Sequence, residues 1–461
     1  MARSWSSSVD AHLDWTPGSG RAGLAAAMRA AIRDGRWPPG SVVPSTRALA
    51  HDLGLARGTV TRVYADLTAE GYLSTSQGAP TRVATAGAAP LAAWPTPPRP
   101  PLSRWTLQPG RPDPGTFPRA AWLAATRRVL QQAPNEVFDY ADPRGSPELR
   151  AALSAYLGRA RGVLADPARI VVCAGFNHGI SLLGRALREV GRTETAFEDP
   201  SVDRFRDIMA AAGQRVVGVP VDGAGLRVAE LASPAVVVTP AHQFPLGVTM
   251  APERRAALAA SGALVVEDDY DGEFRYDRNP VGALQALAPE RVVHAGTVSK
   301  TLAPSLRLAW LVLPRFLVDP VLAAVTASGA HPPMLPQLVL AGLIASGAYD
   351  RHIRRRRLEY RARRDRLVAA LPAGWTPEGI AAGLHLVLRM PLDHEQRAVA
   401  AAGRHSLRLG RLSPMWMGEV ADRGGLVIGY GASPGNAFGG ALGALEAVLA
   451  EVDEGPRREP T

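Results

Sequence analysis

Apolar residues recur at helical spacing in three short segments near the N-terminus. The first spans residues 24–32 and should end at Gly35. The second should begin behind a capping Ser45 and end at Gly54, whose backbone readily adopts a left-handed turn. The third spans residues 57–69, with apolar side chains at i, i+3, i+4 and i+7. The pattern predicts three short helices, the last two joined by a tight turn.

The outer face of the third predicted helix is rich in Arg and Thr. Taken alone, such a face is typical of any solvated helix. Two helices joined by a tight turn, the second with this face, are also what a helix-turn-helix needs to enter the major groove of DNA. The following segment STSQGAPTRVA, residues 74–84, predicts a hairpin with Gly78 and Pro80 at its tip. This wing would bring Arg82 near phosphate or the minor groove.

Residues 86–104 read AGAAPLAAWPTPPRPPLSR, a segment dense in Pro and Ala without an acidic residue. Proline favours an extended, semi-rigid backbone, so this segment is predicted to be a linker and not part of a core. It separates a small N-terminal domain, expected at 10–85, from a large C-terminal domain, expected at 105–455.

The large domain contains short, nearly continuous apolar runs separated by helical stretches. These runs are IVVCAG, TAFEDP, RVVGVPV, AVVVTP, ALVVEDD, RVVHAGTVSK and LAWLVLP. Continuous apolar runs are typical of parallel strands that are buried on both faces. We therefore expect an α/β domain whose ligands lie beyond the carboxyl ends of the strands.

Composition narrows the function classes. With 46% hydrophobic and 20% charged residues, the 461-residue chain is globular. The net charge of +10 permits a polyanionic partner, although a general bias toward arginine would produce it as well. The single Cys173 excludes a disulfide framework and a cysteine-based zinc site, and no metal is expected. No secretory signal or membrane span is recognisable, so we expect a cytoplasmic protein.

Lys300 is the only lysine among the 52 Lys and Arg residues. A primary amine can lose its proton and attack a carbonyl, whereas a guanidinium stays protonated and cannot. Chance survival of one rare residue is the alternative explanation.

Several polar residues follow the predicted strands at a spacing that suits pyridoxal phosphate. Lys300 ends TVSK, and Asp268 and Tyr270 belong to EDDY at the end of another strand. A lysine that forms a Schiff base and a carboxylate that keeps a pyridine nitrogen protonated are the minimum apparatus for this cofactor. Hydroxyls, an arginine and free backbone amides could hold its phosphate. Singly, each of these features is also common in solvated loops.

Residues 35–73, GRWPPGSVVPSTRALAHDLGLARGTVTRVYADLTAEGYL, resemble the winged helix-turn-helix of GntR-type regulators. The resemblance implies that Arg47, Arg57, Thr59 and Thr61 contact DNA. Arg62 on the same helix and Arg82 in the wing are further candidates. Ala56 and Gly58 depart from the pattern, since a capping Ser or Thr and a larger polar residue are usual there.

Residues 105–450 resemble the fold type I aminotransferases, with GTVSKTLAPSLRLAWLVLP as the most specific segment. The resemblance implies that Lys300 is the Schiff-base lysine, Asp268 the pyridine partner and Tyr270 the partner of the ring hydroxyl; Asp269 is the other register for the carboxylate. The implied phosphate site comprises Thr297, Ser299, Arg307, the backbone amides of Gly175, Phe176 and Asn177, and Tyr140 from the neighbouring subunit.

The winged helix, the linker and the aminotransferase-like domain, in this order, resemble the MocR family of bacterial transcriptional regulators. This resemblance implies a homodimer that binds pyridoxal 5'-phosphate and double-stranded DNA, with the N-terminal module packed on the partner subunit. The effector would be an amino compound or the cofactor itself. The alternatives are an active aminotransferase with a DNA-binding appendage and a regulator that has lost the cofactor.

Some positions depart from the family pattern. Val202 stands where an aromatic residue commonly stacks on the cofactor, although Arg204 keeps the spacing of an effector-binding arginine. Pro414 and Met415 replace the usual Arg and Tyr of a carboxylate clamp, which leaves Arg411 and Arg423 as candidates.

A run of arginines between residues 354 and 364 predicts a helix with positive charge around most of its surface. A solvated helix is the first interpretation, and a track for DNA phosphates is the second.

Overall fold

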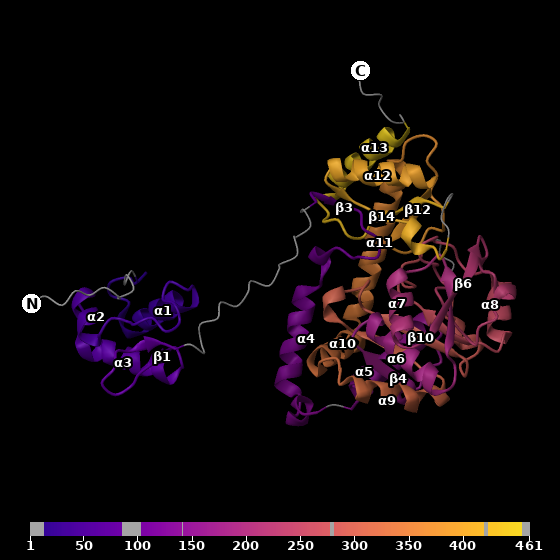
Figure 1. Ribbon diagram of the computed structural model, residues 1–461. Coiled ribbons are helices and arrows are strands. Elements are labelled where there is room, and N and C mark those ends of the chain that lie inside the picture. Colours follow the sequence, from indigo (N-terminus) through magenta and orange to yellow (C-terminus); the bar gives the residue numbers. More distant parts are fainter. Residues whose placement is uncertain (1–12, 85–102, 141, 277–280, 419–422, 454–461) are drawn as a thin grey trace, which may run out of the picture. The chain divides into compact units, whose positions relative to one another are not determined.

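The computed structural model describes residues 13–84, 103–140, 142–276, 281–418 and 423–453. The chain divides into two compact units, residues 1–100 and 101–461 (Figure 1). Most of the linker expected at 86–104 lies outside the described residues.

The described residues of the N-terminal unit, 13–84, form three helices and a two-stranded hairpin. They are α1 Gly20–Arg33, α2 Thr46–Asp52, α3 Arg57–Ala69, β1 Leu73–Ser74 and β2 Arg82–Val83. The Ser45 side chain caps α2 by accepting a hydrogen bond from the Ala48 amide, and Gly54 has a φ of 66° in the turn. Ala56 at the start of α3 provides no side-chain cap. The three predicted helices and the wing hairpin are confirmed.

The core of this unit is formed by one face of each helix and by the hairpin. Leu24, Met28, Leu49, Val60 and Val83 are among its fully buried side chains. The buried Tyr64 donates a hydrogen bond to the carbonyl of Pro44 at 2.6 Å, which fixes α3 against the segment that precedes α2. Helix α3 is therefore anchored on its inner side, and its other side faces solvent.

The large unit is built around an eight-stranded sheet in the order β4-β11-β10-β9-β8-β5-β6-β7. Its strands are β4 Ile170–Cys173, β5 Glu194–Asp199, β6 Arg215–Asp222, β7 Gly225–Leu226, β8 Ala235–Val238, β9 Leu264–Asp268, β10 Val292–Thr297 and β11 Ala309–Val312.

The strands from β10 through β6 run parallel, as predicted. The expectation of parallel strands is wrong for β11, which runs antiparallel to both β10 and β4. The connection between β10 and β11, residues 298–308, contains no α-helix and is short. A parallel neighbour would need a crossover of about a dozen residues or more, usually through a helix, so β11 returns antiparallel.

Helices cover both faces of this sheet. On one face, α6 Phe176–Glu189, α7 Asp203–Ala211 and α9 Val318–Ser328 pack on a continuous apolar cluster that includes Val266 and Ala295. The other face carries α5 Pro147–Arg161, α8 Pro252–Ala260 and α10 Met334–Ala345. The result is a three-layer α/β/α arrangement, and none of the described helices is long and apolar enough to cross a membrane.

A smaller lobe is formed mostly by residues that follow the sheet in sequence, joined by β3 Trp105–Thr106 from before it. The long α11 Ala348–Ala369 leads into it, and α12 Leu392–Arg404 and α13 Phe438–Asp453 pack on its strands (Figure 1). The strands are β12 His385–Arg389, β15 Gly425–Gly429 and β14 Gly410–Arg411 in one sheet, and β3 Trp105–Thr106 paired with β13 Leu407–Arg408. The remaining helix, α4 Arg119–Gln132, buries only Ala125.

The acidic residues at the end of β9 point to opposite sides, as side chains of a strand must. Glu267 accepts hydrogen bonds from the amides of Leu284 and Gln285. Asp269 forms a two-point ion pair with the buried Arg161 at 2.6 and 2.9 Å. Burial would raise the pKa of Asp269, but Arg161 and His294 lower it below the ordinary value. Asp268 lies between them and faces the other way.

We predict that Arg161→Leu lowers the free energy of unfolding by about 3–5 kcal/mol, because it leaves a buried carboxylate without its partner. The matched control is Arg159→Leu on the same helix, whose exposed pair with Asp350 should contribute less than about 1 kcal/mol. Urea unfolding of both variants tests this. Equal losses of stability would contradict the assignment of the Arg161–Asp269 pair as a structural anchor.

Candidate cofactor site and DNA-binding surface

A cavity of about 720 Å³ opens where the adjacent strands β9 and β10 end. Most of the residues expected at a cofactor site line it. These are Asp268, Tyr270, Ser299, Lys300, Thr297, Arg307, Phe176 and Asn177. The cavity also receives residues from the segment 109–114.

Asp268 is buried, and its Oδ1 atom has no hydrogen-bond partner in the described part of the chain. Burial raises the pKa of this carboxyl well above its ordinary value, while the Lys300 amine opposes the increase. A buried carboxylate that lacks a partner costs several kcal/mol unless another group pairs with it. This unpaired oxygen fits the protonated nitrogen of a pyridine ring.

Lys300 lies three residues beyond β10, and its Nζ donates a hydrogen bond to the carbonyl of Gly110 at 2.6 Å. Burial lowers the pKa of the amine, Arg111 lowers it further, and Asp268 and Asp271 oppose the change. A lowered pKa increases the fraction of neutral amine at a given pH, which is the form that attacks an aldehyde.

Tyr270 follows Asp268 by two residues and lies on the same side of the chain. Its hydroxyl is 3.1 Å from Nδ1 of His242 and donates to the carbonyl of His242 at 3.1 Å. His242 Nδ1 also lies 2.9 Å from Oδ2 of Asp271. The ring of Phe244, in the loop 242–247, is perpendicular to that of Tyr270 and lines the cavity. These contacts fix the phenol at the cavity wall.

Hydroxyls, an arginine and a helix N-terminus gather at another part of the cavity. The Thr297 hydroxyl lies 2.8 Å from Ser299 Oγ and accepts from the Ser299 amide, so it positions Ser299. Arg307 donates to the carbonyl of Ala174 and lies against Gly175, where any Cβ would come within 2.9 Å of the guanidinium carbon. Gly175 precedes α6, whose first residues are Phe176 and Asn177. Such a cluster suits a phosphate group.

Two residues expected at the phosphate site, Tyr140 and Gly175, do not line the cavity, whereas Val202 and Arg204 do. Tyr140 is fully exposed and does not line the cavity of its own chain. Gly175 is not among the lining residues either, although it shapes the helix start beside them. Val202 and the exposed Arg204 both line the cavity.

Arg411 and Arg423, the candidates for a carboxylate clamp, do not line the cavity. Arg411 is paired with Glu395 at 3.1 Å, and Arg423 lies over the ring of Trp416. The cavity instead contains Met415, whose carbonyl accepts from Arg206. Neither candidate for the carboxylate clamp therefore lies at the wall of this cavity.

Phe205 and Arg111 are among the lining residues that were not predicted from the sequence. Phe205 meets Phe176 edge to face, with ring centroids 4.8 Å apart, so aromatic surface is present despite Val202. Arg111 is exposed, lines the cavity and has no ion-pair or hydrogen-bond partner among the described residues. A position two residues after the Pro109 turn carries no sequence signal of this role.

The N-terminal unit presents the expected DNA-contacting residues on its surface. Arg47, Arg57, Thr61, Arg62 and Arg82 are exposed, and Thr59 is half-buried. Arg82 also donates to the carbonyl of Gly40, which ties the wing to the turn before α2. The side chains of Arg57 and Arg62 have no ion-pair or hydrogen-bond partner among the described residues, so their charges are available to phosphate or base edges.

Each of the two units matches a known protein family. Residues 21–83 match the gntR family of bacterial regulatory proteins, and residues 110–408 match aminotransferase class I and II. The chain is 33% identical over 453 residues to the HTH-type pyridoxine biosynthesis transcriptional regulator PdxR of Corynebacterium glutamicum, covering 93% of this chain and 94% of that one. The chain belongs to the MocR/PdxR family of HTH-type transcriptional regulators.

A second relative and a solved structure support the family and the fold of this MocR/PdxR-family regulator. The chain is 33% identical to the probable rhizopine catabolism regulatory protein MocR of Rhizobium meliloti, covering 87% of this chain and 88% of that one. The fold of the large unit matches an archaeal alanine:glyoxylate aminotransferase with a TM-score of 0.69 at 24% identity, over 76% of this chain and 91% of that one. The aminotransferase class I and II domain binds pyridoxal 5'-phosphate, which is the cofactor of this regulator.

We predict that Asp268→Asn weakens the affinity for pyridoxal phosphate by about tenfold or more, because it removes a charge-assisted hydrogen bond. The melting temperature of the cofactor-free protein should stay the same or rise, since an unpaired buried carboxyl is lost. Absorbance titration and thermal melting measure the two effects. Asp269→Asn is the control and should lower the melting temperature. An Asp268→Asn variant with wild-type cofactor affinity would disprove the pairing.

Proposed function

We propose that this regulator senses either an amino compound or pyridoxal phosphate itself in the cavity at Lys300, and that the occupant changes the binding of DNA by the winged helix. The observation that supports this best is the convergence of the only lysine, an unpaired buried carboxyl and a phosphate-binding cluster on one cavity. The cofactor supplies an aldehyde carbon that a primary amine can attack.

In this proposal, each residue has a defined task. Lys300 holds the cofactor covalently, Asp268 accepts a hydrogen bond from its ring nitrogen, and Tyr270 binds its ring hydroxyl. Thr297, Ser299 and Arg307 hold the phosphate together with the amides of Gly175, Phe176 and Asn177. Arg204 binds the effector, and Arg111 joins it as a second cation.

We also propose that the regulator is a homodimer whose Tyr140 reaches the cofactor site of the partner. Supporting this, Leu123, Leu130, Phe138 and Tyr140 are all strongly exposed along α4 and the segment that follows it. Neighbouring exposed apolar side chains of this size are typical of an interface. The DNA-binding domain would comprise residues 10–85, the linker 86–104 and the effector domain 105–455, acting in the cytoplasm where the DNA is.

The two exposed arginines predict how an amino compound is selected. Amino acids should perturb the visible absorbance of the bound cofactor more strongly than the amines that lack their carboxylates. Arg111→Gln or Arg204→Gln should remove this preference and leave the response to simple amines intact. Titration of the cofactor-loaded proteins with glycine and methylamine, and with β-alanine and ethylamine, measures it. An unchanged preference in both variants would show that neither arginine binds the anionic group.

The winged helix generates a separate prediction. Arg57→Ala should weaken binding to DNA from the regulator's own promoter and reduce the salt dependence of binding by about one unit of slope, because one phosphate or base contact is lost. The cofactor absorbance should not change. Arg21→Ala is the control, since Arg21 on α1 is paired with Asp66. Equal DNA affinity of Arg57→Ala and wild type would remove Arg57 from the recognition surface.

A further inference from the structure

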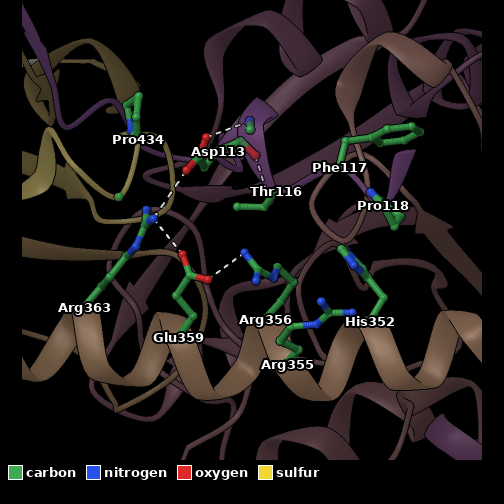
Figure 2. Close-up of a pocket in the computed structure, with 12 residues that line it drawn as sticks. Asp113, Thr116, Phe117, Pro118, His352, Arg355, Arg356, Glu359, Arg363 and Pro434 are labelled. Carbon is green, nitrogen blue, oxygen red and sulfur yellow. Dashed lines mark hydrogen bonds and ion pairs between the residues drawn. The ribbon is translucent and has the colours of Figure 1, made fainter. Parts of the chain in front are cut away.

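A second cavity, of about 560 Å³, lies beside α11 and away from the residues that hold the cofactor. Figure 2 shows side chains from α11 on one side and the segment 113–118 on the other. The charged side chains that line it are Arg355, Arg356, Arg363, Asp113 and Glu359. Arginines therefore outnumber acids on its wall.

The acidic residues and one arginine belong to a structural network. Arg363 is buried and donates to the carbonyl of Ser433 at 2.7 Å, while its other terminal nitrogen pairs with Glu359 at 2.6 Å and with Asp113 at 3.4 Å. Figure 2 shows Glu359 between Arg363 and Arg356, paired with both. Glu359 is thus shared by two guanidinium groups, and with Asp113 it balances their charge, so the third arginine of the wall, Arg355, is not balanced by an acid.

The unbalanced charge lies on Arg355, and Arg356 keeps a donor that no acceptor uses. Arg356 is only 8% exposed, and its Nε is buried without a hydrogen-bond partner within the described chain. Arg355 is exposed and has no ion-pair or hydrogen-bond partner there. Burial lowers the pKa of His352 on the same wall, and both arginines lower it further. His352 therefore adds no positive charge to the cavity at neutral pH.

We propose that this cavity is a binding site for a small oxyanion, the phosphate or carboxylate group of a metabolite. A buried guanidinium with an unused donor is costly unless an acceptor pairs with it, and its planar fork suits the oxygens of phosphate or carboxylate. The volume admits a small molecule and not a strand of DNA. This proposal does not depend on the identity of the effector at Lys300.

Two connections through the chain link the second cavity to the cofactor cavity. Residues 109–112 line the cofactor cavity and continue directly into Asp113 and the segment that lines the second cavity. His352 also lies 2.7 Å from the carbonyl of Thr301, the residue after Lys300. An oxyanion bound here would therefore contact a segment that continues from Gly110, the acceptor of the Lys300 amine, and a helix whose His352 lies against Thr301.

The test is calorimetric titration of the full-length, cofactor-saturated protein with inorganic phosphate at constant ionic strength. Saturation fills the phosphate site near Arg307, so the titration reports the second cavity. Arg355→Gln and Arg356→Gln should each weaken phosphate binding by about tenfold or more, as expected for loss of a charge-assisted hydrogen bond. Arg354→Gln is the matched control, because Arg354 is exposed on the same helix and does not line the cavity. Arg355 is exposed too, so its variant should fold normally.

Three results would overturn the proposal. Phosphate affinity could be the same in wild type, Arg355→Gln and Arg356→Gln. Arg307→Gln could abolish phosphate binding that Arg355→Gln and Arg356→Gln leave intact, which would place the ion at the cofactor site. The Arg355→Gln variant could lose salt-dependent DNA affinity while keeping phosphate affinity, which would make this surface a contact for DNA.

Discussion

The carboxyl group of Asp268 is buried at the end of β9 with one oxygen unpaired, and the chemistry of the cofactor cavity depends on this position. Strand alternation turns its neighbours Glu267 and Asp269 to the other side, where backbone amides and Arg161 satisfy them. Of the three carboxyl groups at the end of β9, only that of Asp268 has an oxygen free to pair with a ligand. The parallel neighbour β10 ends beside it and supplies Lys300, so an amine and a carboxyl from segments far apart in sequence face one cavity.

Much of this site could be predicted from the sequence because its signals are local. Lys300 stands out as the only lysine, and a strand ending in EDDY brings Asp268 and Tyr270 to one side at a spacing of two residues. The three N-terminal helices were equally predictable, since Ser45 and Gly54 mark the ends of α2 with ordinary capping chemistry. The direction of β11 was not, because it depends on the short connection from β10 and not on the apolar pattern.

The residues that sequence reasoning missed act through tertiary contacts. Arg111 comes to the cavity from a loop without a motif, and Phe205 follows the expected Arg204 on α7 at a position that carried no signal of its own. The run of arginines on α11 has no clear apolar stripe, so it favoured a solvated helix; the structure confirms exposure for Arg354, Arg355, Arg357 and Arg361 but buries Arg356 and Arg363. The partners of these two arginines come from distant parts of the sequence. They are Glu359 on the same helix, Asp113 and Ser433. Periodicity alone contains no information on such partners.

The central claim is that the cavity at Lys300 controls DNA binding, and the affinity for labelled DNA from the regulator's own promoter tests it most directly. The dissociation constant should be measured for wild type and for Lys300→Ala, each with and without pyridoxal phosphate and simple amino compounds. The account predicts that these ligands change the wild-type constant by about fivefold or more, as in typical allosteric coupling. It also predicts no change for Lys300→Ala. A wild-type constant that no ligand alters, or an equal response of the variant, would contradict it.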